Sequence, residues 1–295
     1  AAARPGRPPP TIVDNRMPLT TSVFTDSALA PAPAPIVRRE DIGRVALVVL
    51  DRPRSRNALS DAMLAALAET FAGLAAERRI RAVVLAAEGP VFCAGHDLKE
   101  MTAHRRDPDR GRAYFADLLT RCAAVMQAVV NLPQPVIAAV NGTATAAGCQ
   151  LVASCDLAVA AADARFCTPG VDIGLFCSTP MVALSRNVAR KHAMAMLLTG
   201  DMIDAAEAAR IGLVNQVVEP GRERAEALAL AERIGGKTAV AIRHGKQAFY
   251  RQRELPLADA YHYAATVMTE NMMARDAEEG IDAFIGKRSP TWEDQ

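Results

Sequence analysis

The segment "PVIAAVNGTATAAGCQLVASCDLAVAA" at residues 135–161 decides the fold class of this chain. It contains an apolar run, a glycine-bearing turn, a short helix of small residues and a second apolar run. Apolar runs of this length, bounded by turn residues, are typical of parallel strands that are buried on both faces. We therefore expect strand, helix and strand in succession, which is the building unit of an α/β protein.

Similar elements lie on both sides of this segment. Residues 36–50 predict two strands around a turn at Asp41–Gly43, and Ser60 is expected to cap a helix over residues 61–77. Further patterns predict a strand at 81–89, a helix at 111–131 and strands at 156–161 and 164–169, and residues beyond 180 are mostly helical. We expect a disordered leader at 1–34, an α/β core at 35–225 and a helical region at 226–295.

The composition argues against several classes of partner. The 295 residues carry a net charge of +1 and only 4% aromatic side chains, which does not favour nucleic acid. No apolar run reaches the roughly 18 residues that span a bilayer, so we expect no membrane insertion. Six cysteines without CxxC spacing favour reduced thiols and no metal site. We expect a cytoplasmic protein, with the mitochondrial matrix as the alternative, and leave open whether Ala1 or Met17 is the native start.

Five segments in order resemble the crotonase superfamily, which includes enoyl-CoA hydratases and isomerases. They are "RNALS", "FCAGHDLKEM", the segment at 135–161, "LTGDMIDAAEAARIGLVNQVV" and "EEGIDAFIGKRSPTW". The run "FCTPGVDIGLFCSTP" is most similar to the subgroup of enoyl-CoA hydratase domain-containing protein 3. The resemblance implies a spiral of ββα units followed by a C-terminal helical region that trimerises, and a homotrimer or a dimer of trimers.

The resemblance also implies a ligand and a chemistry. The ligand is an acyl-CoA thioester of fatty acid metabolism, with no cofactor beyond its coenzyme A moiety. Two backbone N–H groups form an oxyanion hole that holds the thioester oxygen as it becomes an enolate, and each such donor is worth about 3–4 kcal/mol. In this sequence the matching donors are His96 and Ala147. Ala147 opens a predicted helix, whose free N–H groups favour negative charge.

The hydratase glutamates are missing. The resemblance places the first at Gln150 and the second at Gly170. Glutamine can position a water molecule but cannot take its proton, and glycine offers no side chain. Each general acid–base step contributes about 10²- to 10⁴-fold to a rate, so efficient hydration by the usual route is doubtful.

Three other residues are candidates for the missing chemistry. Asp172 would share a side with position 170 if the segment were extended, although a loop carboxylate that caps or pairs outside the pocket is the more ordinary interpretation. Cys177 is a nucleophile only if its pKa is lowered, and a buried structural thiol is favoured. His96 titrates near neutrality, but its imidazole can simply line the channel.

The coenzyme A end is predicted from the resemblance and from charge. The loop "DRPRSRNALS" brings arginines to the border of the nucleotide and the pantetheine, and guanidinium groups suit phosphate. A solvated basic loop is the alternative. The candidate binding residues are Arg54, Arg56, Ala58, Lys99, Phe284 and Lys287.

Two functions fit the sequence best, and the sequence does not decide whether the chain is an enzyme. The first is an acyl-CoA-processing protein that acts on a short- or medium-chain acyl or enoyl thioester, as a lyase or isomerase. The second is a non-catalytic acyl-CoA-binding or regulatory protein of lipid metabolism. An RNA-binding relative is a third possibility, against which charge and aromatic content argue.

Overall fold

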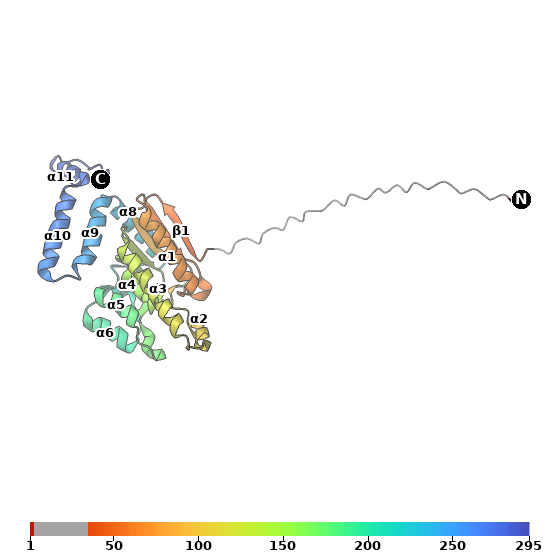
Figure 1. The fold of residues 1–295 in the computed structure, drawn as a ribbon. Coiled ribbons are helices and arrows are strands. Elements are labelled where there is room, and N and C mark those ends of the chain that lie inside the picture. The colour runs from red at the N-terminus through yellow and green to blue at the C-terminus, as the bar shows by residue number, and fades with distance from the viewer. Residues whose placement is uncertain (3–34, 295) are drawn as a thin grey trace. The chain divides into compact units, whose positions relative to one another are not determined.

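A six-stranded sheet forms the centre of the fold (Figure 1). The computed structural model describes residues 1–2 and 35–294, so nearly all of the predicted leader lies outside the described residues. Only the first pair of strands is antiparallel, and the other neighbours are parallel. In spatial order the strands are β1 (Val37–Ile42), β2 (Val45–Leu50), β3 (Ala82–Ala87), β5 (Val136–Val140), β7 (Leu157–Ala161) and β10 (Gln216–Val218).

A second, smaller sheet runs beside the first. Its order is β4 (Val91–Cys93), β6 (Thr143–Thr145), β8 (Arg165–Cys167) and β9 (Ile203–Asp204). The strands β4, β6 and β8 each directly follow a strand of the large sheet, so the chain repeats a ββα turn as the resemblance implies. The sequence patterns did not reveal β4 and β6, because each is a three-residue strand inside a glycine-bearing loop.

The helices of the core begin and end close to their predicted limits. The side chain of Ser60 accepts a hydrogen bond from Met63 N and caps the first long helix, as expected. The helices are α1 (Asp61–Ala76), α2 (Leu98–Ala103), α3 (Arg112–Asn131), α4 (Ala147–Ser154), α5 (Ser178–Asn187), α6 (Arg190–Thr199), α7 (Ala205–Arg210), α8 (Glu223–Gly235), α9 (Ala239–Gln252), α10 (Leu257–Met272) and α11 (Arg275–Ile285). Three short 3₁₀ segments add η1 (Pro53–Ser55), η2 (His104–Arg106) and η3 (Pro169–Ile173).

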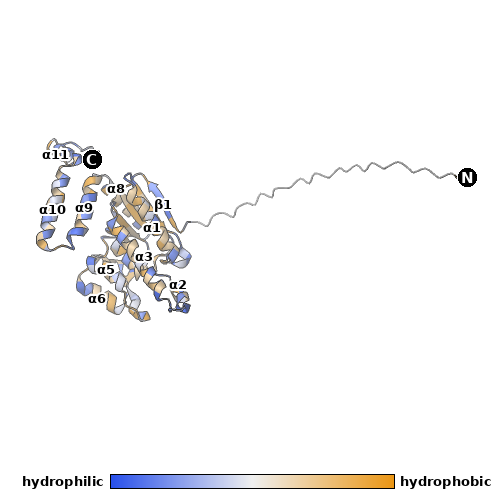
Figure 2. Ribbon diagram, viewed as in Figure 1, coloured by the Kyte–Doolittle hydropathy of each residue, from blue (hydrophilic) through white to orange (hydrophobic). Residues whose placement is uncertain are grey.

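Both faces of the large sheet are buried. Ala46, Val48 and Leu50 of β2 belong to the main core, which α1, α3 and α4 complete. The alternate residues Val45, Leu47 and Val49 belong to a second core under α8. Burial on both faces explains the continuous apolar runs in the sequence. The edge strand β1 is exposed over most of its length and is drawn blue in Figure 2.

The helix α3 is long and apolar enough to cross a bilayer by length and composition alone. Its side chains Leu118, Cys122 and Val125 are buried in the main core, where the helix packs against α1. The apolar character of α3 is therefore accounted for by the core of this fold.

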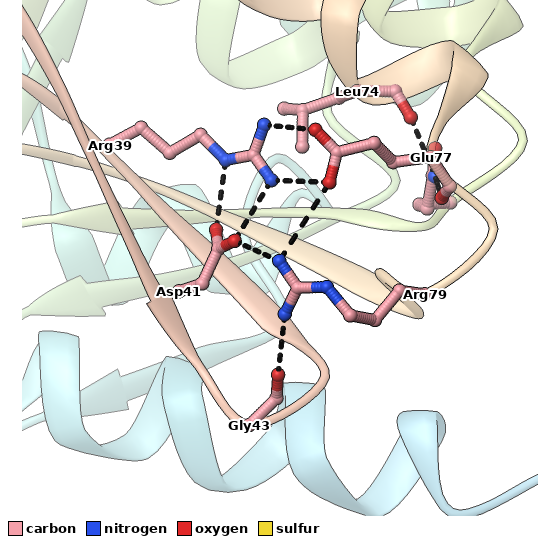
Figure 3. A network of polar contacts seen from close by, with 7 residues as sticks. Arg39, Asp41, Gly43, Leu74, Glu77 and Arg79 are labelled. Carbon is pink, nitrogen blue, oxygen red and sulfur yellow. Dashed lines mark hydrogen bonds and ion pairs between the residues drawn. The ribbon is translucent and has the colours of Figure 1, made fainter.

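A network of charged residues fastens the edge strand to the end of α1 (Figure 3). Arg39 donates to Asp41 Oδ1 at 2.8 Å and to Glu77 Oε1 at 2.6 Å, and Arg79 pairs with Asp41 and donates to Gly43 O at 3.3 Å. These guanidinium groups lower the pKa of Asp41 and of Glu77. The network is largely exposed, so its contribution to stability is small and sensitive to salt.

A buried ion pair fixes α9 to the core. Lys246 Nζ lies 2.7 Å from Asp156 Oδ2 and donates to two backbone carbonyls of the segment 129–134. Tyr250 donates to the other oxygen of Asp156 at 2.9 Å, and Val136 N donates to Oδ2 at 2.7 Å. Figure 1 shows α9 and α10 side by side, and α11 packs on α10. The predicted division at residue 226 stays a prediction, and residues 35–294 lie within one compact unit.

Candidate functional site

Two loops carry the predicted oxyanion donors His96 and Ala147, and we call them the first and the second cradle loop. The first cradle loop follows β4 and holds Gly95 in a left-handed conformation. Its φ is +83°, which favours glycine. A Cβ on Gly95 would also lie 3.1 Å from Ala146 Cβ and 3.3 Å from Ala147 N. Glycine is therefore required here both by the backbone and by space, and the loop that carries His96 touches the loop that carries Ala147.

The second cradle loop joins β6 to α4. Ala146 has φ 49° and ψ −118°, a conformation that L residues rarely adopt, and it stands directly before the first helical residue, Ala147. Gly148 lies so close to β4 that a Cβ would meet Cys93 O at 2.1 Å. The close approach of backbone to backbone thus requires the one glycine that this loop retains.

The two predicted donors have no protein acceptor. Within residues 35–294, neither the N–H of His96 nor the N–H of Ala147 donates to a protein atom. Thr145 Oγ1 donates to Ala94 O at 3.0 Å, which ties the loops together beside the donors. Two free N–H groups on adjoining loops, one of them at a helix N-terminus, make an arrangement that suits a developing oxyanion.

Asn57 organises the loop that supports the first donor. Its Nδ2 donates to Glu88 O at 2.9 Å and to Val91 O at 2.8 Å, while its Oδ1 accepts from Arg52 N at 2.8 Å. The residue is fully buried and has φ 50°, a conformation that asparagine tolerates better than most residues. In the same loop, Leu59 N donates a hydrogen bond to Gly95 O at 2.8 Å.

The two positions of the missing glutamates lie in different surroundings. Gln150 is on α4, one turn after Ala147, and is 5% exposed. Gly170 is buried in η3, where a Cβ would lie 2.9 Å from Cys177 Sγ and 3.1 Å from Leu175 O. The space beside Gly170 is therefore filled by the Cys177 thiol and a carbonyl group, so a side chain at 170 needs the neighbours to shift.

The extended segment that would put Asp172 on the same side as position 170 is not present, and the role of Asp172 stays a prediction. Residues Pro169–Ile173 instead form a 3₁₀ helix, because Pro169 starts a turn that Gly174 ends in a left-handed conformation. Asp172 is exposed, and its carboxylate lies against Gly200, where a Cβ would meet Oδ2 at 3.1 Å.

Two other titratable groups are close to the cradle. Burial raises the pKa of the Cys177 thiol, so it is a protonated thiol at neutral pH and not an activated nucleophile. Burial lowers the pKa of His96, which keeps its imidazole neutral. Neither group therefore presents a charge to the cradle.

The structure brings only part of the predicted coenzyme A set to the cradle. Arg56 O accepts from Ala94 N at 3.1 Å, so the loop with Arg54, Arg56 and Ala58 adjoins the first cradle loop. Lys99 is exposed in the first turn of α2, just after that loop. Phe284 and Lys287 lie at the end of α11, and no hydrogen bond or ion pair among residues 35–294 joins α11 to the cradle loops. Phe284 is 85% exposed.

Sequence reasoning missed two contributors to the site. The strain at Ala146 carries no sequence signal, because alanine is common in helices and only the observed φ reveals it. Thr168 is 1% exposed, and its hydroxyl has no hydrogen-bond partner among residues 35–294. The three hydrogen bonds of Asn57 also carry no sequence signal.

Comparisons with known proteins agree over nearly the whole described chain. The sequence model of the family described as Enoyl-CoA hydratase/isomerase matches residues 40–295. The chain is 47% identical over 245 residues to "Enoyl-CoA hydratase domain-containing protein 3, mitochondrial" of Mus musculus, covering 83% of this chain and 80% of that protein. The Homo sapiens protein of the same name is 46% identical over 245 residues, covering 83% and 79%.

Solved structures give the same result. A crystal structure of an enoyl-CoA hydratase from Mycobacterium smegmatis superposes with a TM-score of 0.84 at 52% identity, covering 88% of this chain and 99% of that chain. The crystal structure of human enoyl Coenzyme A hydratase domain-containing protein 3 gives a TM-score of 0.82 at 44% identity, covering 87% and 100%.

Proposed function

The chain belongs to the enoyl-CoA hydratase/isomerase family, also called the crotonase family, and from this premise we propose that it binds a short- or medium-chain acyl-CoA thioester and stabilises its enolate. The thioester oxygen accepts from the N–H groups of His96 and Ala147. The observation that carries the proposal is the pair of free N–H groups on two loops in contact, around a Gly95 whose conformation and close neighbours disfavour any side chain. Such preorganised donors act without reorganisation when charge develops on the oxygen.

The protein groups available for proton transfer limit the chemistry. Gln150 replaces one glutamate, Gly170 the other, and Cys177 holds its proton at neutral pH. A lyase or isomerase activity on enoyl thioesters is therefore proposed to be slow, because neither of the two glutamate positions carries a carboxylate.

A non-catalytic acyl-CoA-binding role is the second candidate, and one specific observation favours it. The space beside Gly170 is closed by Cys177 Sγ and Leu175 O. A glutamate enters only if Cys177 Sγ, 2.9 Å from the added Cβ, and Leu175 O, 3.1 Å from it, shift, so the surroundings of the second acid position favour its absence. A protein of lipid metabolism that holds the thioester without converting it fits this arrangement.

The proposals on coenzyme A binding, assembly and location rest on charge and on similarity to relatives. Arg54, Arg56 and Lys99 form no ion pair among residues 35–294 and remain available for phosphates, next to Ala58 at the pantetheine. Phe284 and Lys287 reach coenzyme A from a neighbouring copy in a trimer or a dimer of trimers. The mouse and human relatives carry "mitochondrial" in their names, which supports the matrix and gives no support to the cytoplasmic expectation.

Infrared spectroscopy of butyryl-CoA labelled with ¹³C at the thioester carbonyl tests the cradle directly. Two N–H donors weaken the carbonyl bond, so we expect its stretching frequency to fall on binding. The comparison variant is Gly95→Ala, in which the added Cβ would press on Ala146 and Ala147 N and so disturb the loops that carry the two donors. Binding with an unchanged carbonyl frequency, or no binding at all, contradicts the proposal.

A further inference from the structure

A cleft of about 390 Å³ opens between the end of α1, the first half of α9 and the amino ends of β3 and β5. We call it the arginine cleft, and its lining includes Glu77, Arg78, Arg81, Gln134 and Arg243. The strands β4 and β6, which lead into the cradle loops, follow the carboxyl ends of β3 and β5. Because β3 has six residues at about 3.3 Å each, its two ends lie roughly 17 Å apart. The arginine cleft is therefore separate from the candidate site.

Two buried side chains in the arginine cleft each keep one polar atom without a hydrogen-bond partner. Arg81 is 7% exposed and Gln134 is 6% exposed, and both line this one cleft. Among residues 35–294, Arg81 Nη1 and Gln134 Oε1 have no partner. Buried polar atoms without partners are uncommon, because they lose their hydrogen bonds to water and gain none in return. Two of them in one cleft indicate a ligand that supplies both partners.

The other polar atoms of these two side chains hold them in place. Gln134 Nε2 donates to Leu74 O at 2.8 Å and to Glu77 O at 2.9 Å, so Oε1 is the part of the carboxamide that stays free. Arg81 Nη2 pairs with Asp294, which leaves Nη1 free. The cleft thus offers a ligand one fixed N–H donor and one fixed oxygen acceptor.

The charges around the arginine cleft favour an anion. Arg78 and Arg243 line the cleft and form no ion pair or hydrogen bond within the described range 35–294. The carboxylate of Glu77 is engaged elsewhere, because Arg39 donates to its two oxygens at 2.6 and 2.8 Å (Figure 3). The carboxylate of Asp294 balances only the buried arginine. Two guanidinium groups are therefore left without a counter-charge, and such groups suit oxyanions.

The free atoms select the kind of anion. A carboxylate or a sulfate ion accepts hydrogen bonds from the arginines but has no proton to give to Gln134 Oε1. A neutral alcohol meets Oε1 but leaves the guanidinium groups unbalanced. Hydrogen phosphate meets both requirements, because three of its oxygens accept and its hydroxyl donates.

We propose that the arginine cleft is a second binding site and that its ligand is the hydrogen phosphate ion. Arg81 Nη1 donates to the phosphate oxygens, Arg78 and Arg243 supply the remaining positive charge, and Gln134 Oε1 accepts from the phosphate hydroxyl. Arg243 belongs to α9, whereas Arg81 and Gln134 lie just before β3 and β5. The bound ion therefore connects the C-terminal helices to the central sheet.

Calorimetric titration of the full chain at pH 7.5 with phosphate, sulfate and methyl phosphate tests the choice of ligand. The second pKa of a phosphate monoester is about 6, so methyl phosphate has no hydroxyl left to donate at this pH. Hydrogen phosphate keeps its hydroxyl. We expect phosphate to bind about fivefold more tightly than either of the other anions, as one additional hydrogen bond predicts.

Three variants test the location of the site. Arg81→Lys keeps a charge for Asp294 but loses the free Nη1, and Arg243→Gln removes an unbalanced charge without breaking a contact among residues 35–294. Each should weaken phosphate binding by about fivefold. Arg54→Gln is the matched control, because Arg54 is an exposed arginine in the loop beside the first cradle loop. This variant should bind phosphate as the wild type does.

Each contrary outcome overturns a stated part of the inference. Equal binding of the three anions to the wild type, or no binding of phosphate, overturns hydrogen phosphate as the ligand. Binding that is lost in Arg54→Gln and kept in Arg243→Gln places the ion in the basic loop and overturns the site. Arg243 lies outside the buried pair, so Arg243→Gln decides the location even if Arg81→Lys does not fold.

Discussion

Ala146 is a strained residue at the centre of the site. Its φ of 49° places a Cβ where L residues are disfavoured, at a cost of about 1–3 kcal/mol. Hydrogen bonds on both sides hold it there, because Ala146 N donates to Cys167 O and Gln150 N donates to Ala146 O, both at 3.0 Å. The strain is retained at the turn directly before Ala147, one of the two predicted oxyanion donors.

Replacement of Ala146 by glycine should stabilise the protein by about 1 kcal/mol, since glycine removes the strain and only partly offsets it through the greater entropy of the unfolded chain. Urea unfolding measures the change. Ala65→Gly, at an exposed position inside α1, is the matched control and should cost about 1 kcal/mol. Equal destabilisation by both substitutions would show that Ala146 is not strained.

His96 should make stability depend on pH. Burial lowers the pKa of its imidazole in the folded state, so the unfolded chain takes up the proton at a higher pH than the folded one. The contribution of His96 to the free energy of unfolding is complete above the ordinary histidine pKa of about 6.5. It is lost as the pH falls below that value toward the lower pKa of the folded state. Unfolding free energies measured between pH 5 and 8 should fall on the acid side less steeply in His96→Asn, and an unchanged slope in that variant would contradict the assignment.

The element that joins the helical region to the core is α9, and its attachment depends on the Lys246–Asp156 pair. The side chain of Lys246 is buried, and burial lowers its pKa against the opposing effect of Asp156. Removal of one member of a buried pair leaves the other charge unbalanced.

Lys246→Met should therefore lower the free energy of unfolding by about 3–5 kcal/mol, measured by urea unfolding. Lys191→Met is the matched control, because Lys191 is exposed on α6 and should change stability by less than about 0.5 kcal/mol. A cost for Lys246→Met as small as that of the control would mean that α9 is held by packing alone.

Among the helices and strands, the sequence predicted those that show a hydrophobic pattern or a helix cap. The buried strands β2, β3, β5 and β7 were visible as apolar runs, and α1 as a capped amphipathic helix. Of the small sheet only β8 was predicted, as the strand at 164–169, because strands of two or three residues such as β4, β6 and β9 have no measurable period. The 3₁₀ helix Pro169–Ile173 was not predicted, because its conformation depends on a proline start and a left-handed end and not on a hydrophobic pattern.

At the scale of the whole molecule, the predicted crotonase family, its subgroup and the α/β fold with a C-terminal helical region are confirmed by the match over residues 40–295 and by the solved relatives. The family could be predicted from the sequence because five motifs occur in the order typical of the family, even though single residues within them differ. The roles of His96, Ala147 and Gln150 stay predictions, since a hydrogen bond to a ligand depends on positions of a few tenths of an ångström that no sequence pattern records.

The C-terminal helices expose many large apolar side chains for a single chain. They include Leu257, Tyr261, Met268, Met273, Phe284 and Ile285, an arrangement that calls for a covering partner. We expect sedimentation equilibrium to give three copies, or six. Met268→Glu should shift the chain toward monomers, whereas Glu270→Gln on the same helix should not. A monomeric wild type would contradict the predicted assembly and the contribution of Phe284 from a neighbouring copy.

The most direct test of the central claim is hydration of crotonyl-CoA, with binding of the same ligand measured in parallel. The claim is an intact thioester cradle without its acids, so we expect the wild type to bind and not to hydrate efficiently. The variant Gln150→Glu/Gly170→Glu/Cys177→Ala restores both acids and removes the Cys177 Sγ contact at 170, and it should gain about 100-fold or more. Efficient hydration by the wild type would contradict the account, because a base other than the two family glutamates would then activate water.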